Sequence, residues 1–89
     1  MKIKKGFVLR KIGNEQVIIG EGIEQVDFNK IVRLNDTGVD LWNEMQKGDF
    51  TAATIANYIV ANYVGIDENV ALTDAETFID RLLKAGLLE

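Results

Sequence analysis

The first third of the chain alternates short apolar runs with turn residues, which is the pattern of β-strands. Residues 7–12 and 16–20 are rich in Val, Ile and Leu, and the Gly13-Asn14 pair between them is typical of a two-residue hairpin turn. Residues 31–34 form a third predicted strand. The pattern leaves open whether residues 24–28 form a strand of their own.

The pattern then changes to the helical period of about 3.6 residues. A first helix is predicted to begin with Asn35 or Asp36 as its N-cap and to end at Gly48, and a second to run from about Thr51 to Gly65. Their apolar positions are Val39, Leu41, Trp42, Met45, Ala52, Ile55, Ala56, Ile59 and Tyr63. The lone tryptophan lies at the centre of the first apolar face, so it is expected to anchor the core.

A third helix is predicted from about Asp67 to Gly86, a natural stop. Its apolar face spans roughly 140°, against the ~100° of a simple surface helix. That face comprises Phe78, Ala71, Leu82, Ala75, Ile79, Leu72 and Leu83, with Asp74, Arg81 and Ala85 just beyond the Phe78 edge. We therefore expect one stripe to pack on the core and the other edge to line a groove.

Strands followed by helices in 89 residues predict one α+β domain covering residues 1–89. The expected architecture is a winged helix-turn-helix, in which a small antiparallel N-terminal sheet precedes three helices.

Composition excludes several classes of site. The chain has no cysteine and no histidine, which removes disulfides, thiol chemistry and most zinc sites, and no calcium-binding loop pattern is present. No cofactor is expected. Residues 1–5 are basic, but Arg10 and Lys11 interrupt the apolar stretch that a signal peptide needs. The longest uncharged run, residues 50–66, is shorter than a membrane span, so the cytoplasm is the expected location.

Charge is unevenly distributed. Residues 1–35 hold seven Lys/Arg against four Asp/Glu, whereas residues 36–89 hold three against ten. A DNA-binding protein carries its basic residues on the element that enters the groove, and here the helical part is acidic. The basic N-terminal segment (Lys2, Lys4, Lys5, Arg10 and Lys11) is interpreted as a solvated end.

Other candidate sites have simpler interpretations. Gly20-Glu21-Gly22 lacks the third glycine of a phosphate-binding loop and is read as a turn. The carboxylate pairs Asp36/Asp40 and Glu76/Asp80 are expected on solvated faces, and Tyr58 and Tyr63 are expected to pack in the core or on the surface. Strand 31–34 is of more interest, because an edge strand followed directly by a helix can pair with an extended peptide.

The stretch Leu34-Asn35-Asp36-Thr37-Gly38, followed by Leu41-Trp42, resembles the L-N-[DE]-T-[GA]-x-x-[IL]-W signature of the PqqD-like family. The similarity continues through Asp27-Phe28-Asn29 upstream and through the later helices to Ala85-Gly86-Leu87-Leu88, and so covers residues 7–88. Asn35 or Asp36 is read as a helix cap, and Gly38 as a small residue that permits close approach by the strand or the third helix.

The resemblance implies a peptide clamp. Such proteins hold the leader segment of a ribosomally made precursor peptide by strand addition and present it to a modifying enzyme, often a radical SAM enzyme. The positions that the resemblance assigns to peptide binding are Ile31, Val32, Arg33, Leu34, Asp74, Phe78, Arg81 and Leu82.

Two alternatives to a peptide-binding module remain. Winged helices also serve DNA-binding regulators, although residues 51–63 carry no charge. The chain can also be a structural or oligomerisation subunit, and both a monomer and a homodimer fit the sequence. Catalysis, nucleic-acid binding and membrane association are not expected.

Overall fold

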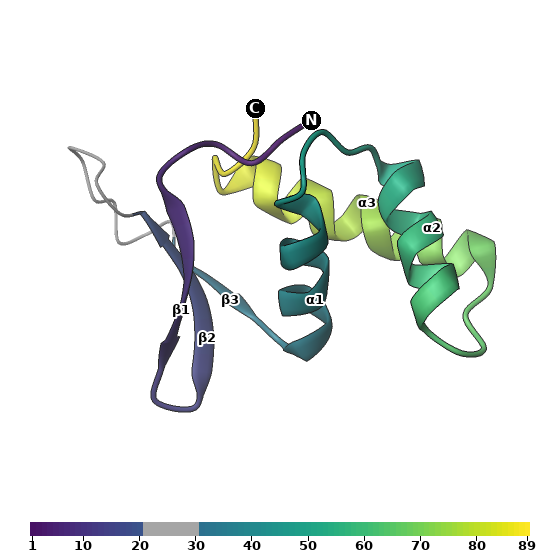
Figure 1. Ribbon diagram of the computed structural model, residues 1–89, viewed down its shortest axis with the longest axis horizontal. Helices are drawn as coiled ribbons and strands as arrows, with labels where there is room; N and C mark the ends of the chain where they lie inside the picture. The colour runs from purple at the N-terminus through teal and green to yellow at the C-terminus, as the bar shows by residue number, and fades with distance from the viewer. Residues whose placement is uncertain (21–30) are drawn as a thin grey trace.

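The computed structural model describes residues 1–20 and 31–89, and the elements follow the order expected for an α+β fold (Figure 1). Within these residues a three-stranded antiparallel sheet precedes three helices, which confirms the predicted fold class. The elements are β1 Phe7–Ile12, β2 Glu15–Gly20, β3 Val32–Leu34, α1 Asp36–Met45, α2 Ala52–Asn62 and α3 Glu68–Lys84.

The hairpin joins β1 and β2 through Gly13 and Asn14 as predicted. Gly13 has φ 62°, a left-handed conformation that glycine adopts without steric cost. β2 begins at Glu15, one residue earlier than predicted, because Glu15 pairs with Ile12 across the turn. The possible strand at 24–28 and the turn after Gly20 lie outside the described residues.

β3 is shorter than predicted. It pairs antiparallel with β2, and the register ends at the pair Ile18↔Val32. Ile31 therefore precedes the strand rather than belonging to it, and 41% of its surface is exposed. The prediction that Ile31 starts the strand is wrong.

Helix caps explain where the helices begin. Asn35, not Asp36, is the N-cap of α1, and its side chain accepts a hydrogen bond from Gly38 N at 2.8 Å. Thr51 and Thr54 form a reciprocal capping box at α2. α3 begins after Asp67, whose carboxylate accepts a bond from Asn69 N. Side-chain oxygens thus satisfy backbone donors at all three described N-termini.

The predicted C-terminal ends are only partly right. α1 ends at Met45 and α2 at Asn62, both before the glycines Gly48 and Gly65 that were expected to stop them. The end of α3 is confirmed, because Ala85 is its C-cap and Gly86 follows with φ 79°.

The core lies between one face of the sheet and the three helices. Trp42 of α1 is completely buried, which confirms it as a core anchor. Ile18, Val32 and Leu34 contribute from the sheet. The inner face of α3 is formed by Ala71, Ala75, Ile79 and Leu82. None of the helices in the described part of the chain is long and apolar enough to cross a membrane.

The two ends of the chain are paired with each other (Figure 1). Lys2 N donates to Glu89 O at 3.0 Å, Glu89 N donates to Lys2 O at 2.9 Å, and Lys4 N donates to Leu87 O at 2.9 Å. The Met1 ammonium also donates to Phe50 O at 2.9 Å. The interpretation of this segment as a solvated end is therefore wrong for its backbone, although the Lys2, Lys4 and Lys5 side chains are exposed.

Candidate peptide-binding site

β3 forms one edge of the sheet that the described residues make, because the strand order is β1-β2-β3. Its side chains alternate: Val32 and Leu34 are 5% and 8% exposed in the core, whereas Arg33 lies on the outer face. The Arg33 guanidinium pairs with Glu15 at 3.1 Å, an exposed ion pair that contributes little to stability. The inward side chains thus hold the strand in place while its outer edge carries backbone hydrogen-bonding groups.

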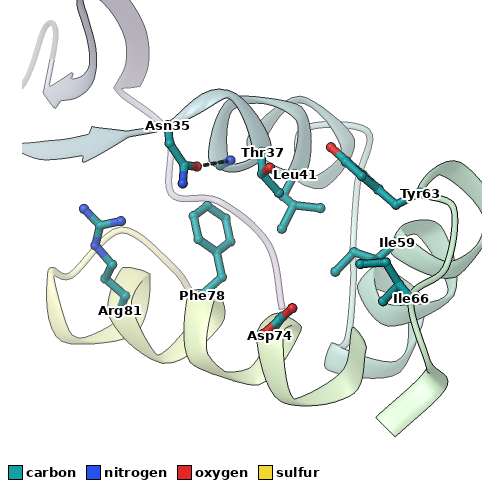
Figure 2. Close-up of a pocket in the computed structure, with 10 residues that line it drawn as sticks. Asn35, Thr37, Leu41, Ile59, Tyr63, Ile66, Asp74, Phe78 and Arg81 are labelled. Atoms are coloured by element: carbon teal, nitrogen blue, oxygen red, sulfur yellow. Dashed lines mark hydrogen bonds between the residues drawn. The ribbon is translucent and has the colours of Figure 1, made fainter. Parts of the chain in front are cut away.

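A cavity of about 320 Å³ opens between α1, α3 and the α2–α3 connection (Figure 2). It reaches the end of β3 through Asn35, which directly follows that strand. The lining mixes apolar and polar side chains. It comprises Asn35, Thr37, Gly38, Leu41, Ile59, Tyr63, Ile66, Asp74, Phe78 and Arg81.

Three of these residues lie along one face of α3. Phe78, which is partly buried, stands between Arg81 and Asp74 in Figure 2 and faces Asn35 across the cavity. Asp74 and Arg81 are two helical turns apart, about 10 Å along the axis. The cavity wall therefore offers a carboxylate, an aromatic ring and a guanidinium in that order.

Arg81 also connects α3 with β3. Its Nη2 donates to the Arg33 carbonyl oxygen at 2.5 Å. A hydrogen bond from a charged donor is roughly twice as strong as a neutral one. This contact places the cationic end of the cavity wall directly at the edge of the sheet.

Gly38 explains part of the sequence motif. A Cβ at this position would lie 3.2 Å from Asn35 Oδ1, 3.2 Å from Leu34 Cδ2 and 3.3 Å from Leu34 Cβ. These distances are shorter than the ordinary 3.5–4.0 Å contact between carbon atoms. Glycine thus lets α1 approach β3 closely, as predicted for the strand.

Asp40 is half-buried, and its carboxylate is hydrogen-bonded to other side chains rather than only solvated as predicted. Its two carboxylate oxygens accept hydrogen bonds of 2.6 Å, one from Tyr58 Oη and one from Tyr63 Oη. The Tyr58 and Tyr63 hydroxyls, in that order, lower the pKa of Asp40. The Asp40 bond raises the pKa of Tyr58 to about 12, and it also raises the pKa of Tyr63. This cluster holds α1 against the end of α2 and orients Tyr63, one wall of the cavity.

The other predicted carboxylate pair is exposed, as expected. Glu76 and Asp80 lie on the outer surface of α3, and Asp80 pairs with Lys84 at 2.8 Å. Within residues 1–20 and 31–89, no group of three or more acidic, His or Cys side chains is placed to hold a metal ion.

The structure brings together four of the eight residues assigned to peptide binding: Arg33, Asp74, Phe78 and Arg81. Val32 and Leu34 join them only through the backbone, since their side chains are buried. Leu82 is fully buried beneath this surface, and Ile31 lies just outside the strand.

The end of α2 and the α2–α3 connection also line the cavity, which the sequence pattern did not predict. Ile59 of α2, Tyr63 at its C-cap and Ile66 in the connection line it from this side. Ile66 precedes the N-cap Asp67, the position where an apolar residue packs against the first turn of a helix. This position of Ile66 could have predicted that the α2–α3 connection packs inward.

A search of curated proteins finds no match. Among solved structures, this chain is similar to "TbiB1 in Complex with the TbiA(beta) Leader Peptide", with a TM-score of 0.74 and 25% sequence identity, covering 100% of this chain and 95% of that one. The family model described as "Coenzyme PQQ synthesis protein D (PqqD)" matches residues 15–88. The chain therefore belongs to the PqqD family.

Proposed function

We propose that this protein is a non-catalytic recognition module that binds the leader segment of a ribosomally made precursor peptide. The observation that carries this proposal is the outer edge of β3, placed beside a cavity that reaches the end of the same strand. The PqqD family assignment and the similarity to a structure solved with a leader peptide support the same function.

Binding would occur by strand addition. The peptide backbone would pair with the edge of β3, and one of its side chains would enter the cavity over Phe78. The buried side chains of Val32 and Leu34 favour this mode, because they fix the strand without needing a partner on its other side. Leu82 would support the surface from beneath.

We further propose that the bound leader is presented to a modifying enzyme, often a radical SAM enzyme in similar proteins. An extended leader held at one edge leaves its remaining residues free to enter a second protein. The role assigned to this chain is therefore to raise the local concentration of the substrate at the enzyme.

The DNA-binding alternative gains no support. α2, the helix that a winged-helix regulator would place near DNA, carries no charged residue between Ala52 and Asn62. Affinity for DNA depends on Lys and Arg contacts to phosphates, which this helix does not offer.

An NMR titration of the labelled protein with the leader segment of a candidate precursor peptide tests the proposal. We expect shifts at Val32–Leu34 and along α3 from Asp74 to Leu82. A scrambled leader serves as the negative control. Unmoved amides at saturating leader, combined with shifts in α2 on adding a DNA duplex, would replace this proposal with the regulator. A dimer mass in solution with no response to either ligand would favour a structural subunit.

A matched pair of variants tests strand addition itself. Arg33→Pro removes one backbone N–H from the edge, whereas Arg33→Ala removes the side chain and keeps the N–H. Proline is tolerated on an edge strand where its missing N–H faces outward. We expect Arg33→Pro to lose at least about tenfold in affinity, equivalent to ~1.4 kcal/mol, and Arg33→Ala to lose much less. Equal affinities for the two variants would exclude pairing at this edge.

A further inference from the structure

The hydrogen bond between Arg81 and Arg33 occupies the edge at which a peptide would add. In an antiparallel pair, every second residue of an edge strand directs its N–H and C=O away from the neighbouring strand. The Arg33 carbonyl accepts from a helix 48 residues away in sequence, so it faces away from β2. Arg33 is therefore the residue of β3 whose backbone is directed outward.

This edge offers few acceptors. The next outward position along the chain is Asn35, and its carbonyl already accepts the Val39 N–H of α1 at 2.9 Å. Within Val32–Leu34, the Arg33 carbonyl is thus the acceptor available to an incoming strand. Any peptide that pairs there meets the Arg81 guanidinium first.

An incoming peptide that displaces Arg81 from the Arg33 carbonyl leaves its guanidinium in need of another hydrogen-bond acceptor. Phe78 lies one helical turn away on the same face of α3, and Asp74 is about 10 Å along the axis, too distant to replace the lost bond. Two neighbouring carboxylates are already engaged: Asp80 with Lys84 at 2.8 Å and Glu15 with Arg33 at 3.1 Å. A planar guanidinium binds best to a carboxylate, which matches its fork of donors.

We propose that Arg81 is a latch on the β3 edge, and that the latch selects peptides with an Asp or Glu beside the residue that pairs with Arg33. This inference rests on the proposed function and names the chemistry of its ligand. A peptide N–H takes the Arg33 carbonyl, and a peptide carboxylate takes the released guanidinium. A neutral peptide gains the first bond but leaves Arg81 without its acceptor.

The wall of the cavity also relates the position of the acidic residue to the rest of a bound peptide. Asp74 makes no ion pair with any described residue and lies at the opposite end from Arg81. An extended peptide advances about 3.3 Å per residue, so the ~10 Å between these two side chains corresponds to about three residues. A bound leader therefore places its acidic residue near Arg81, an apolar residue over Phe78 and a residue about three positions away near Asp74.

The test is a selection of binders from a random peptide library displayed on phage, run in parallel on the wild-type protein, Arg81→Met and Glu76→Gln. Arg81 and Glu76 are both exposed, so neither variant should disturb the fold, and thermal melting checks this. We expect wild-type binders to carry Asp or Glu at one fixed position. Binders of Arg81→Met should lose that preference, and binders of Glu76→Gln, a control on the outer surface of the same helix, should keep it.

We would then measure the affinities of one selected acidic peptide and of its neutral counterpart, in which Glu is replaced by Gln or Asp by Asn. The acidic peptide reports the new bond to Arg81, and the neutral peptide reports the cost of displacing Arg81 from the Arg33 carbonyl. The acidic peptide should bind Arg81→Met about tenfold more weakly than wild type. The neutral counterpart should bind Arg81→Met more tightly than wild type, because no latch has to be displaced. Arg81→Lys keeps the positive charge but lacks the planar pair of N–H donors. Its affinity for the acidic peptide should lie between those of the wild type and Arg81→Met.

The outcomes distinguish this inference from the proposed function. Selected peptides that shift the amide signals of Val32–Leu34 and α3 but show no preference for Asp or Glu would contradict the proposed role of Arg81. The proposed function would still stand. Loss of the acidic preference in Glu76→Gln, or weaker binding of the neutral peptide to Arg81→Met, would overturn the latch as well. A library that yields no binder, or binders that shift amides elsewhere, would overturn both proposals.

Discussion

Substituting Gly38 by alanine tests whether the close approach of α1 to β3 is real. Two opposing effects decide the result. Alanine favours a helix over glycine by about 1 kcal/mol. The new Cβ, however, would make three contacts at 3.2–3.3 Å, two of them with Leu34.

The contacts should outweigh the helix propensity. Leu34 Cβ is attached to the backbone of β3 and Asn35 Oδ1 holds the Gly38 N–H, so neither atom can move without breaking a structural bond. Overpacking of this kind costs about 1–3 kcal/mol. We expect Gly38→Ala to lower the free energy of unfolding by about 1 kcal/mol, a fall of roughly 4–8 °C in Tm for a domain of this size.

Thermal unfolding followed by circular dichroism measures this effect. Asn43→Ala is the matched control, because Asn43 is an exposed position in the same helix and its substitution changes propensity alone. The control should gain a few tenths of a kcal/mol, about the difference in propensity between the two residues. A Tm for Gly38→Ala that rises as in the control would show that the neighbours have room, and the close-approach argument would be refuted.

Two other predictions concern the Asp40 cluster and the C-terminal residues. Both tyrosines of the chain contact Asp40, so tyrosinate absorbance should titrate above the ordinary tyrosine pKa, with Tyr58 near 12, and Asp40→Asn should return both titrations toward ordinary values. Because folding lowers the pKa of Asp40, its contribution to the free energy of unfolding is present above the unfolded pKa and is lost as pH falls through the folded pKa. Folding raises the pKa of Tyr58, so its contribution is present below the unfolded pKa and is lost as pH rises through about 12. An unchanged tyrosinate titration in Asp40→Asn would contradict the hydrogen-bonded cluster. Leu87 is fully buried, so Leu87→Ala should cost about 2–5 kcal/mol in urea unfolding, while Leu83→Ala, at a site 48% exposed, should cost much less. Similar losses for the two variants would show that residues 87–89 do not pack on the core.

Local signals made the helices predictable. Asn35, Thr51 and Asp67 each supply a capping oxygen, and the apolar period then fixes which face is buried. The ends of α1 and α2 were misplaced because a glycine can follow a helix by several residues. After α2, for example, the chain leaves the helical path at Tyr63, whose backbone is extended (φ −122°, ψ 130°).

Contacts between distant residues were not predictable from pattern. Asp40 bonds hydroxyls 18 and 23 residues later, a pairing that depends on how α1 packs against α2. The Arg81–Arg33 bond spans 48 residues and depends on where α3 crosses the sheet edge. The family resemblance placed both arginines at the peptide site, but only the packed structure brings them into contact.

The pairing of Lys2 with Glu89 makes the backbone nearly a closed ring. A short linker between the two ends would close it, and new ends could be opened at Gly13-Asn14, where the hairpin turn makes no core contact. In such a circular permutant, β2, β3 and all three helices remain continuous. A protein fused at Met1 would also leave the surface at nearly the same point as one fused at Glu89. A fused protein would therefore occupy nearly the same position relative to the β3 edge whether it is attached at the N-terminus or at the C-terminus.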